Sequence, residues 1–211
     1  MQTKQDVTIK APAFQVATFK LIGNAPLVIH RFSKKTADQM AAKMETGKSA
    51  SSKKNRDPKN PEDSYNEARY ISKDGWDGFH AAAIRLACID VCRLVNFKMT
   101  LAKMSIFVIA DGWDAQEPQV PLIRILGKPI VQRDVCRVET GQPYICYRPA
   151  YHDWKANVKI RWDSDQFSLT DVTNLLMRVG VQCGIGEGRP YSKNSAGMGW
   201  GTFDVGGAKD E

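Results

Sequence analysis

The residues with the clearest chemical potential lie in a glycine-rich segment close to the C-terminus, residues 184–201. Its glycines form two groups of three at alternate positions, namely Gly184, Gly186 and Gly188, and then Gly197, Gly199 and Gly201. Glycine weakens the interior of helices and strands, so a cluster of this kind indicates positive φ angles or a backbone that lies directly against another surface.

The side chains between these glycines indicate what that surface is. Arg189 and Lys193 are cations, and Tyr191 and Trp200 are flat rings in a segment that holds too much glycine to bury them well. Phosphates bind cations and backbone N–H groups, and bases stack on aromatic rings. The segment therefore predicts contact with single-stranded nucleic acid. The alternative is a plain glycine-rich turn that joins a helix to an edge strand.

Neither of two common phosphate-binding loops matches this segment. A P-loop needs a Lys-Ser or Lys-Thr pair directly after a glycine, and the dinucleotide fingerprint lies between a strand and a helix, whereas here the expected order is reversed. The five cysteines are an odd number without a C-x-x-C pair, which indicates buried thiols rather than disulfides or a zinc site. We therefore expect neither a cofactor nor a bound metal.

His30 is the best candidate for a catalytic group among the three histidines. It ends the first extended region beside Arg31, and an imidazole titrates near neutral pH. In RNA cleavage it could protonate a leaving oxygen while Arg31 or Lys193 stabilises a pentacovalent phosphate. The alternative is an ordinary polar residue at the end of a strand.

A lysine-rich tract, residues 33–70, follows the first extended region. It is too poor in apolar side chains to order itself, although residues 36–46 could form a short helix. We interpret it as a mobile basic insertion that closes over a nucleic-acid backbone, with an inert solvated loop as the alternative. The predicted electrostatic clamp consists of Arg31, Lys34, Lys35, Lys53, Lys54 and Arg56.

Length and charge set the class of protein. The chain has 211 residues, a formal net charge of +7 and a sequence pI of about 9.2. These values suit one domain, residues 1–211, with polyanionic partners. No apolar run approaches the roughly 20 residues of a membrane span, and the first residues are polar, unlike a signal peptide. We expect a cytoplasmic protein without a membrane contact.

Apolar periodicity predicts a series of strands and helices. Strands are expected at 14–22, 105–110, 120–126, 130–138, 144–148, 157–162 and 202–205, and helices at 79–95 and 168–180. In 157–162 the apolar side chains should point inward, and Lys159 and Arg161 outward. The order predicts an α+β domain with a ferredoxin-like (RRM-like) β-α-β-β-α-β core, additional strands and the long insertion. Its helices should cover one face of an antiparallel sheet and leave the other open to a ligand, with Arg85 of the first helix as a further contact.

Three segments together resemble the RAMP superfamily of CRISPR-associated RNA-binding proteins: Leu21–His30, Ile71–Arg85 and Gly184–Val205. They are similar to the first strand and its turn, the entry into the first helix, and the glycine-rich loop before the last strand of that superfamily. The resemblance implies a ferredoxin-like core. It also makes the basic insertion similar to the thumb of backbone subunits that polymerise along a guide RNA. A small phage-encoded protein that coats single-stranded nucleic acid would fit the same residues.

These observations predict a non-catalytic protein that binds single-stranded RNA or DNA and oligomerises along it, in the cytoplasm of a bacterium or of an infected host cell. One alternative is a metal-independent endoribonuclease that uses His30. The other is a phage assembly or anti-defence protein whose basic insertion binds an acidic protein partner.

Overall fold

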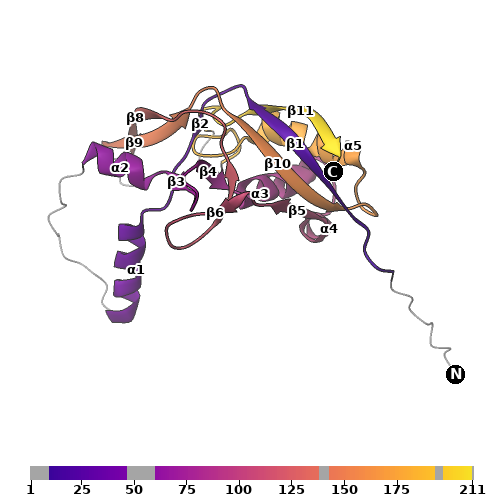
Figure 1. Ribbon diagram of the computed structural model, residues 1–211, viewed down its shortest axis with the longest axis horizontal. Helices are drawn as coiled ribbons and strands as arrows, with labels where there is room; N and C mark the ends of the chain where they lie inside the picture. Colours follow the sequence, from indigo (N-terminus) through magenta and orange to yellow (C-terminus); the bar gives the residue numbers. More distant parts are fainter. Residues whose placement is uncertain (1–9, 47–59, 138–142, 193–196, 211) are drawn as a thin grey trace.

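The computed structural model describes residues 10–46, 60–137, 143–192 and 197–210. Within these ranges the chain has a mixed α/β architecture with three antiparallel sheets (Figure 1). The helices found there are all too short or too polar to cross a membrane.

The main sheet brings the first and last strands of the chain together. Its strand order is β11–β1–β10–β5, and all neighbours are antiparallel. The four strands span Phe203–Asp210 (β11), Phe14–Gly23 (β1), Lys155–Asp163 (β10) and Ile106–Ile109 (β5). The strands predicted at 14–22, 105–110 and 157–162 are confirmed. In β1 and β10 buried and more exposed side chains alternate, so each strand buries one of its faces.

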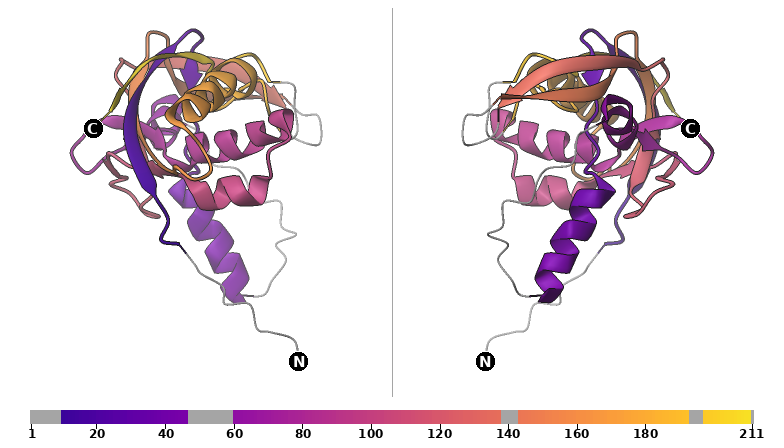
Figure 2. Two further views of the ribbon diagram at one scale, coloured as in Figure 1. Left: turned by 90° about the vertical axis from the view of Figure 1, so that its right-hand side faces the viewer. Right: turned by 90° about the vertical axis from the view of Figure 1, so that its left-hand side faces the viewer.

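Helices cover one face of the main sheet (Figure 2). They are α3 (Ala82–Val91), which continues as the 3₁₀ turn η1 (Cys92–Val95), α4 (Met99–Ser105), and α5 (Leu169–Arg178), which continues as the π-helical turn η2 (Val179–Cys183). The start of α5 is a capping box, because Ser168 Oγ accepts from the N–H of Asp171 and the Asp171 carboxylate accepts from the N–H of Ser168. The predicted helix at 168–180 is therefore confirmed, with its start fixed by reciprocal hydrogen bonds.

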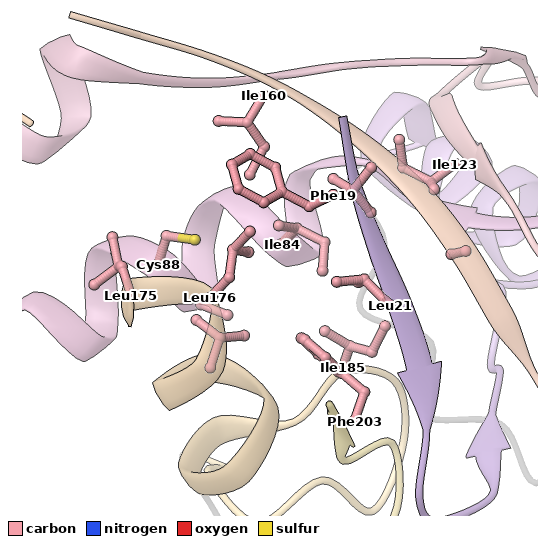
Figure 3. Packing of buried hydrophobic residues seen from close by; sticks show 14 of the residues in the cluster. Phe19, Leu21, Ile84, Cys88, Ile123, Ile160, Leu175, Leu176, Ile185 and Phe203 are labelled. Carbon is pink, nitrogen blue, oxygen red and sulfur yellow. The ribbon is translucent and has the colours of Figure 1, made fainter. Parts of the chain in front are cut away.

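The hydrophobic core lies between the main sheet and these helices (Figure 3). Phe19 and Leu21 of β1 and Ile160 of β10 belong to one fully buried cluster with Ile84 of α3 and Leu176 of α5. Burial of each side chain of this size contributes roughly 1.5–3 kcal/mol. One face of the main sheet is therefore buried in the core, and the opposite face lies outside it.

Two further sheets complete the fold. A three-stranded sheet holds β2 (Leu27–Val28), β9 (Pro143–Tyr151) and β8 (Ile130–Arg137), which confirms the strands predicted at 130–138 and 144–148. The other has the order β3 (Tyr70–Ile71), β4 (Asp77–His80), β7 (Pro121–Arg124) and β6 (Gly112–Trp113).

The helix start predicted at Phe79 is wrong. Phe79 belongs to β4, where it pairs with Ile123 of β7 and is buried. The helix begins only at Ala82, whose N–H donates to Nδ1 of His80 at 3.0 Å. Local periodicity does not reveal this strand, because its partner β7 lies far along the chain.

The basic insertion contains one helix in each of its two described segments, residues 33–46 and 60–70. Helix α1 (Lys34–Thr46) confirms the short helix expected at 36–46 and projects from the body (Figure 2). Helix α2 (Pro61–Glu67) was not expected; Asn60 caps it by accepting from the N–H of Glu62 at 3.1 Å. The expectation that this tract cannot order itself is therefore wrong for residues 61–67.

Candidate nucleic-acid interface

Cations gather on the face of the main sheet that the helices leave open. Lys159 and Arg161 point to this face, as predicted, and so does Lys155 at the start of the same strand. Lys20 of β1 is exposed and lies opposite Asn157 of β10. Residues directly opposite each other in an antiparallel pair share a face, so strand pairing places these four cations on one surface.

Two phenylalanine rings lie at one end of this surface. The guanidinium carbon of Arg161 is 5.1 Å from the ring centroid of Phe14 and 5.1 Å from that of Phe107. The two rings are 5.9 Å apart and meet edge to face, and Phe14 is 40% exposed. A cation over an aromatic face is stabilised by the ring quadrupole, so the two rings help to hold Arg161 in place.

Arg85 joins this group from the edge of the sheet. Its guanidinium carbon lies 5.3 Å from the Phe107 centroid, and its Nε and Nη2 donate to the carbonyls of Ile106 and Lys103 at 2.9 and 2.5 Å. The predicted contact Arg85 is therefore next to the open face, although two of its donors are already used. We call Phe14, Phe107, Arg161 and Arg85 the ring–arginine cluster.

Carboxylates occur on the open face only towards its two ends, within the part of the main sheet whose side chains are described. Asp163 lies opposite Phe14 and accepts from the N–H of Asp165 at 3.0 Å. Asp204 of β11 lies opposite Ile22. Among the described side chains, the ionised groups in the middle of the open face are therefore all cations.

The described part of the glycine-rich loop, residues 184–192 and 197–201, is folded against itself. The six glycines at alternate positions all have positive φ, from 66° to 79°, as their pattern predicted. The need for glycine is clearest at Gly201, where a Cβ atom would lie 1.7 Å from the carbonyl oxygen of Ile185. At Gly188 it would lie 2.5 Å from the ring of Trp200. At both glycines the backbone lies directly against another group, as predicted, and that group belongs to the same loop.

Several amides of the loop have partners inside the protein. The N–H of Gly184 donates to Val179 at 2.7 Å, and that of Gly201 donates to Pro26 at 2.8 Å. The expectation that these two amides bind phosphates is therefore contradicted by their own hydrogen bonds. Gly199 differs, because a Cβ there would meet no other described atom within 4 Å.

The predicted side chains of the loop are only partly free. Tyr191 is 45% exposed, as base stacking requires. Trp200 is half-buried against Gly188, and Arg189 donates to the carbonyl of Gly186 at 3.0 Å. Lys193 lies outside the described residues.

His30 lies beside the loop in a cluster that the sequence did not indicate. Its Nδ1 is 3.7 Å from a carboxylate oxygen of Glu187 and 3.5 Å from Nη2 of Arg148. Arg148 Nε in turn donates to Glu187 at 2.8 Å. The contact arises because the N–H of Glu187 donates to Val28 and β2 pairs with β9, so no local pattern could have linked the three residues.

Arg31 is not part of either surface, contrary to its predicted role in the clamp. Its side chain is only 3% exposed; Nε donates to Asp114 at 2.8 Å and Nη2 to the carbonyl of Glu117 at 3.1 Å. Buried and paired in this way, it cannot reach a phosphate or assist His30. The other clamp residues divide between α1, where Lys34 is exposed and Lys35 lies in the first turn, and the undescribed segment, which contains Lys53, Lys54 and Arg56.

Four of the five cysteines, Cys88, Cys92, Cys146 and Cys183, are buried thiols, as predicted. Burial raises the pKa of Cys88, Cys92 and Cys183, that of Cys183 to about 11, so these three thiols stay protonated and unreactive near neutral pH. No three His, Cys, Asp or Glu side chains of the described chain are arranged to hold a metal ion.

The arrangement offers two chemistries: electrostatic binding with ring stacking on the open face, and an imidazole flanked by a carboxylate and a guanidinium beside the loop. Neither a protein-family model nor a curated protein matches the chain.

Proposed function

We propose that this protein binds single-stranded RNA or DNA, without cleaving it, on the open face of its main sheet. The observation that carries the proposal is Arg161, whose guanidinium carbon lies 5.1 Å from the ring centroids of both Phe14 and Phe107, on a surface that also bears Lys20, Lys155 and Lys159. Exposed rings contribute stacking of roughly 1–3 kcal/mol per base, and the cations attract phosphates. A duplex hides its base faces, so exposed rings favour a single strand.

A ferredoxin-like framework is part of the proposal. In chain order β1, β5, β10 and β11 take the sheet positions 2, 4, 3 and 1, with α3 between the first two strands and α5 between the last two. This order and the helices on one face support a β-α-β-β-α-β core, to which β2–β4 and β6–β9 are additions. The resemblance to the RAMP superfamily agrees with such a core and supports RNA as a ligand.

The proposal is tested by fluorescence anisotropy with labelled uridine and thymidine oligomers at low salt. The double variant Phe107→Ala, Arg161→Ala should bind at least about tenfold more weakly, because it removes a stacking surface and a phosphate contact. Lys128→Ala, which removes an exposed cation outside the main sheet, is the matched control. Wild-type protein that binds neither oligomer would reject the proposal.

Assembly of several copies along one strand is also proposed, because a charged and open sheet face suits a ligand longer than one protein covers. Protein purified without nuclease should elute early in size exclusion with a high absorbance ratio. Digestion by RNase or by DNase should collapse that peak and thereby identify the polymer. A monomeric peak that neither nuclease changes would contradict coating.

Metal-independent RNA cleavage is a second candidate function, favoured by the position of His30. Nδ1 of its exposed ring faces a paired carboxylate and guanidinium: Glu187 could orient the ring, and Arg148 could stabilise a phosphate charge. Labelled RNA should then be cut in EDTA, and His30→Ala should abolish the cutting. His152→Ala is the control, since His152 is an exposed histidine on a separate turn.

A further inference from the structure

The cations of the open face are arranged in successive rows across the strands. Each row consists of residues that lie opposite one another on neighbouring strands. On β1, β10 and β5 each of four consecutive rows contains one cation, and β11 places Lys209 opposite Thr18 of the second row. In order from the ring–arginine cluster, the rows are Val16, Arg161 and Phe107; Thr18, Lys159 and Ile109; Lys20 and Asn157; and Ile22 and Lys155.

The spacing of these rows is regular. Alternate residues of an antiparallel strand lie about 6.8 Å apart on one face, so the four cations span about 20 Å along the strand direction. Consecutive phosphates of an extended single strand are separated by a similar distance. A strand that lies lengthwise can therefore meet one cation per nucleotide, whereas a strand that crosses the sheet meets the cation of only one row.

The carboxylate of Asp204 lies on the β11 side of the cation series. Asp204 belongs to the last row, where Ile22 of β1 separates it from Lys155 of β10. The series of cations thus follows the seam between β1 and β10, and a phosphate backbone displaced towards β11 would approach Asp204. At the other end of the series, Asp163 lies opposite Phe14 of the ring–arginine cluster.

The last row leads to the glycine-rich loop. β1 ends at Gly23, the N–H of Asn24 donates to Thr202 at 3.1 Å, and the N–H of Gly201 donates to Pro26 at 2.8 Å. The loop is therefore joined directly to the end of β1. This loop contains the exposed Met198 and Gly199. A Cβ atom added at Gly199 would meet no other described atom within 4 Å.

We infer that about four nucleotides of a single strand lie lengthwise along the seam between β1 and β10, one phosphate per row. This inference rests on the proposed function. A base at the first row stacks on Phe107, the preceding base stacks on Phe14, and the strand leaves the fourth row towards the glycine-rich loop. The ligand thus follows the strands of the sheet instead of crossing them.

The experiment measures the salt dependence of binding to uridine and thymidine oligomers of two to eight nucleotides. In the polymer that binds more tightly, the slope of log K against log salt should steepen by about 0.7 per added phosphate and level off at about four contacts. Arg161→Ala, Lys159→Ala, Lys20→Ala and Lys155→Ala should each reduce the limiting slope by about 0.7, while Lys128→Ala leaves it unchanged. Arg161→Lys should keep the slope because it keeps the charge.

The variants of the third and fourth rows, Lys20→Ala and Lys155→Ala, decide between a lengthwise strand and one that crosses the sheet. If Lys20→Ala and Lys155→Ala bind like the wild type while Arg161→Ala does not, the strand crosses the sheet at the first row and the lengthwise path is wrong. Absence of wild-type binding to either polymer would instead reject the proposed function itself. Circular dichroism and the melting temperature of each variant separate loss of contact from loss of fold.

Discussion

The guanidinium of Arg31 and the carboxylate of Asp114 form an ion pair of 2.8 Å in which both side chains are almost completely buried. The pair connects the chain that follows β2 with the segment after β6, and Arg31 also lies 5.9 Å from the centroid of Tyr70. His30, one residue earlier, faces solvent. Arg31 therefore stabilises the fold, whereas its neighbour His30 belongs to the surface.

Removal of one member of this pair should destabilise the protein strongly. Asp114→Ala leaves a buried cation without its partner, and we expect the free energy of unfolding to fall by about 3–5 kcal/mol in urea titration. The double variant Arg31→Met, Asp114→Leu should recover much of the loss, because it buries no charge. It should also bind nucleic acid like the wild type. Weaker binding by a well-folded double variant would return Arg31 to the interface.

Two glycines of the loop should respond very differently to alanine. Both Gly199→Ala and Gly201→Ala place a side chain at positive φ, at a cost of roughly 1–2 kcal/mol. Only at Gly201 does the new Cβ overlap a carbonyl oxygen, that of Ile185. Thermal unfolding should show a much larger fall in melting temperature for Gly201→Ala. Equal losses in the two variants would mean that the loop is not packed as described.

Asp77 should hold α2 against the sheets. Its carboxylate accepts from Nε and Nη2 of Arg69 at 2.9 and 2.8 Å, and it also interacts with the buried Tyr151 of β9. Asp77→Asn should cost about 1–3 kcal/mol and accelerate proteolysis in α2, measured by mass spectrometry of the fragments. Asp74→Asn, an exposed neighbour, provides the control. An unchanged cleavage pattern in Asp77→Asn would assign the anchoring of α2 to other contacts.

Stability should fall in alkaline solution partly through Cys183. Burial raises the pKa of this thiol from 9.0 to about 11, so the folded state keeps its proton where the unfolded state loses it. The contribution is complete below about pH 9 and is lost as the pH rises to about 11, by about 1.4 kcal/mol per pH unit. Urea titrations from pH 8 to 10.5 should show a shallower decline for Cys183→Ser than for the wild type. Parallel declines would place the thiol in contact with solvent.

The strands of the main sheet could be predicted from sequence because each carries its own signal. In β10 the alternation from Lys155 to Asp163 indicates both the strand and the outward direction of Lys159 and Arg161. The capping residues Ser168 and Asp171 similarly mark the start of α5. These signals are local, and local physics determines them.

The interface depends on relations that no local signal contains. Phe14 and Phe107 meet only because β1 and β5 both pair with β10, and the register of that pairing is a property of the whole sheet. The burial of Arg31 likewise depends on Asp114, a residue far along the chain. Glycine identity correctly predicted positive φ, but not whether the close neighbour would be a ligand or, as at Gly201, another part of the loop.

The hydrogen bond from the N–H of Ile185 to the carbonyl of Gly201, 3.0 Å long, joins the two ends of the glycine-rich loop. Because the ends are fixed to each other, η2 and β11 keep their positions whatever the length of chain between them. Added residues between Tyr191 and Gly197 should therefore leave the main sheet intact. That segment is a suitable place to insert a fluorophore attachment site or an affinity tag.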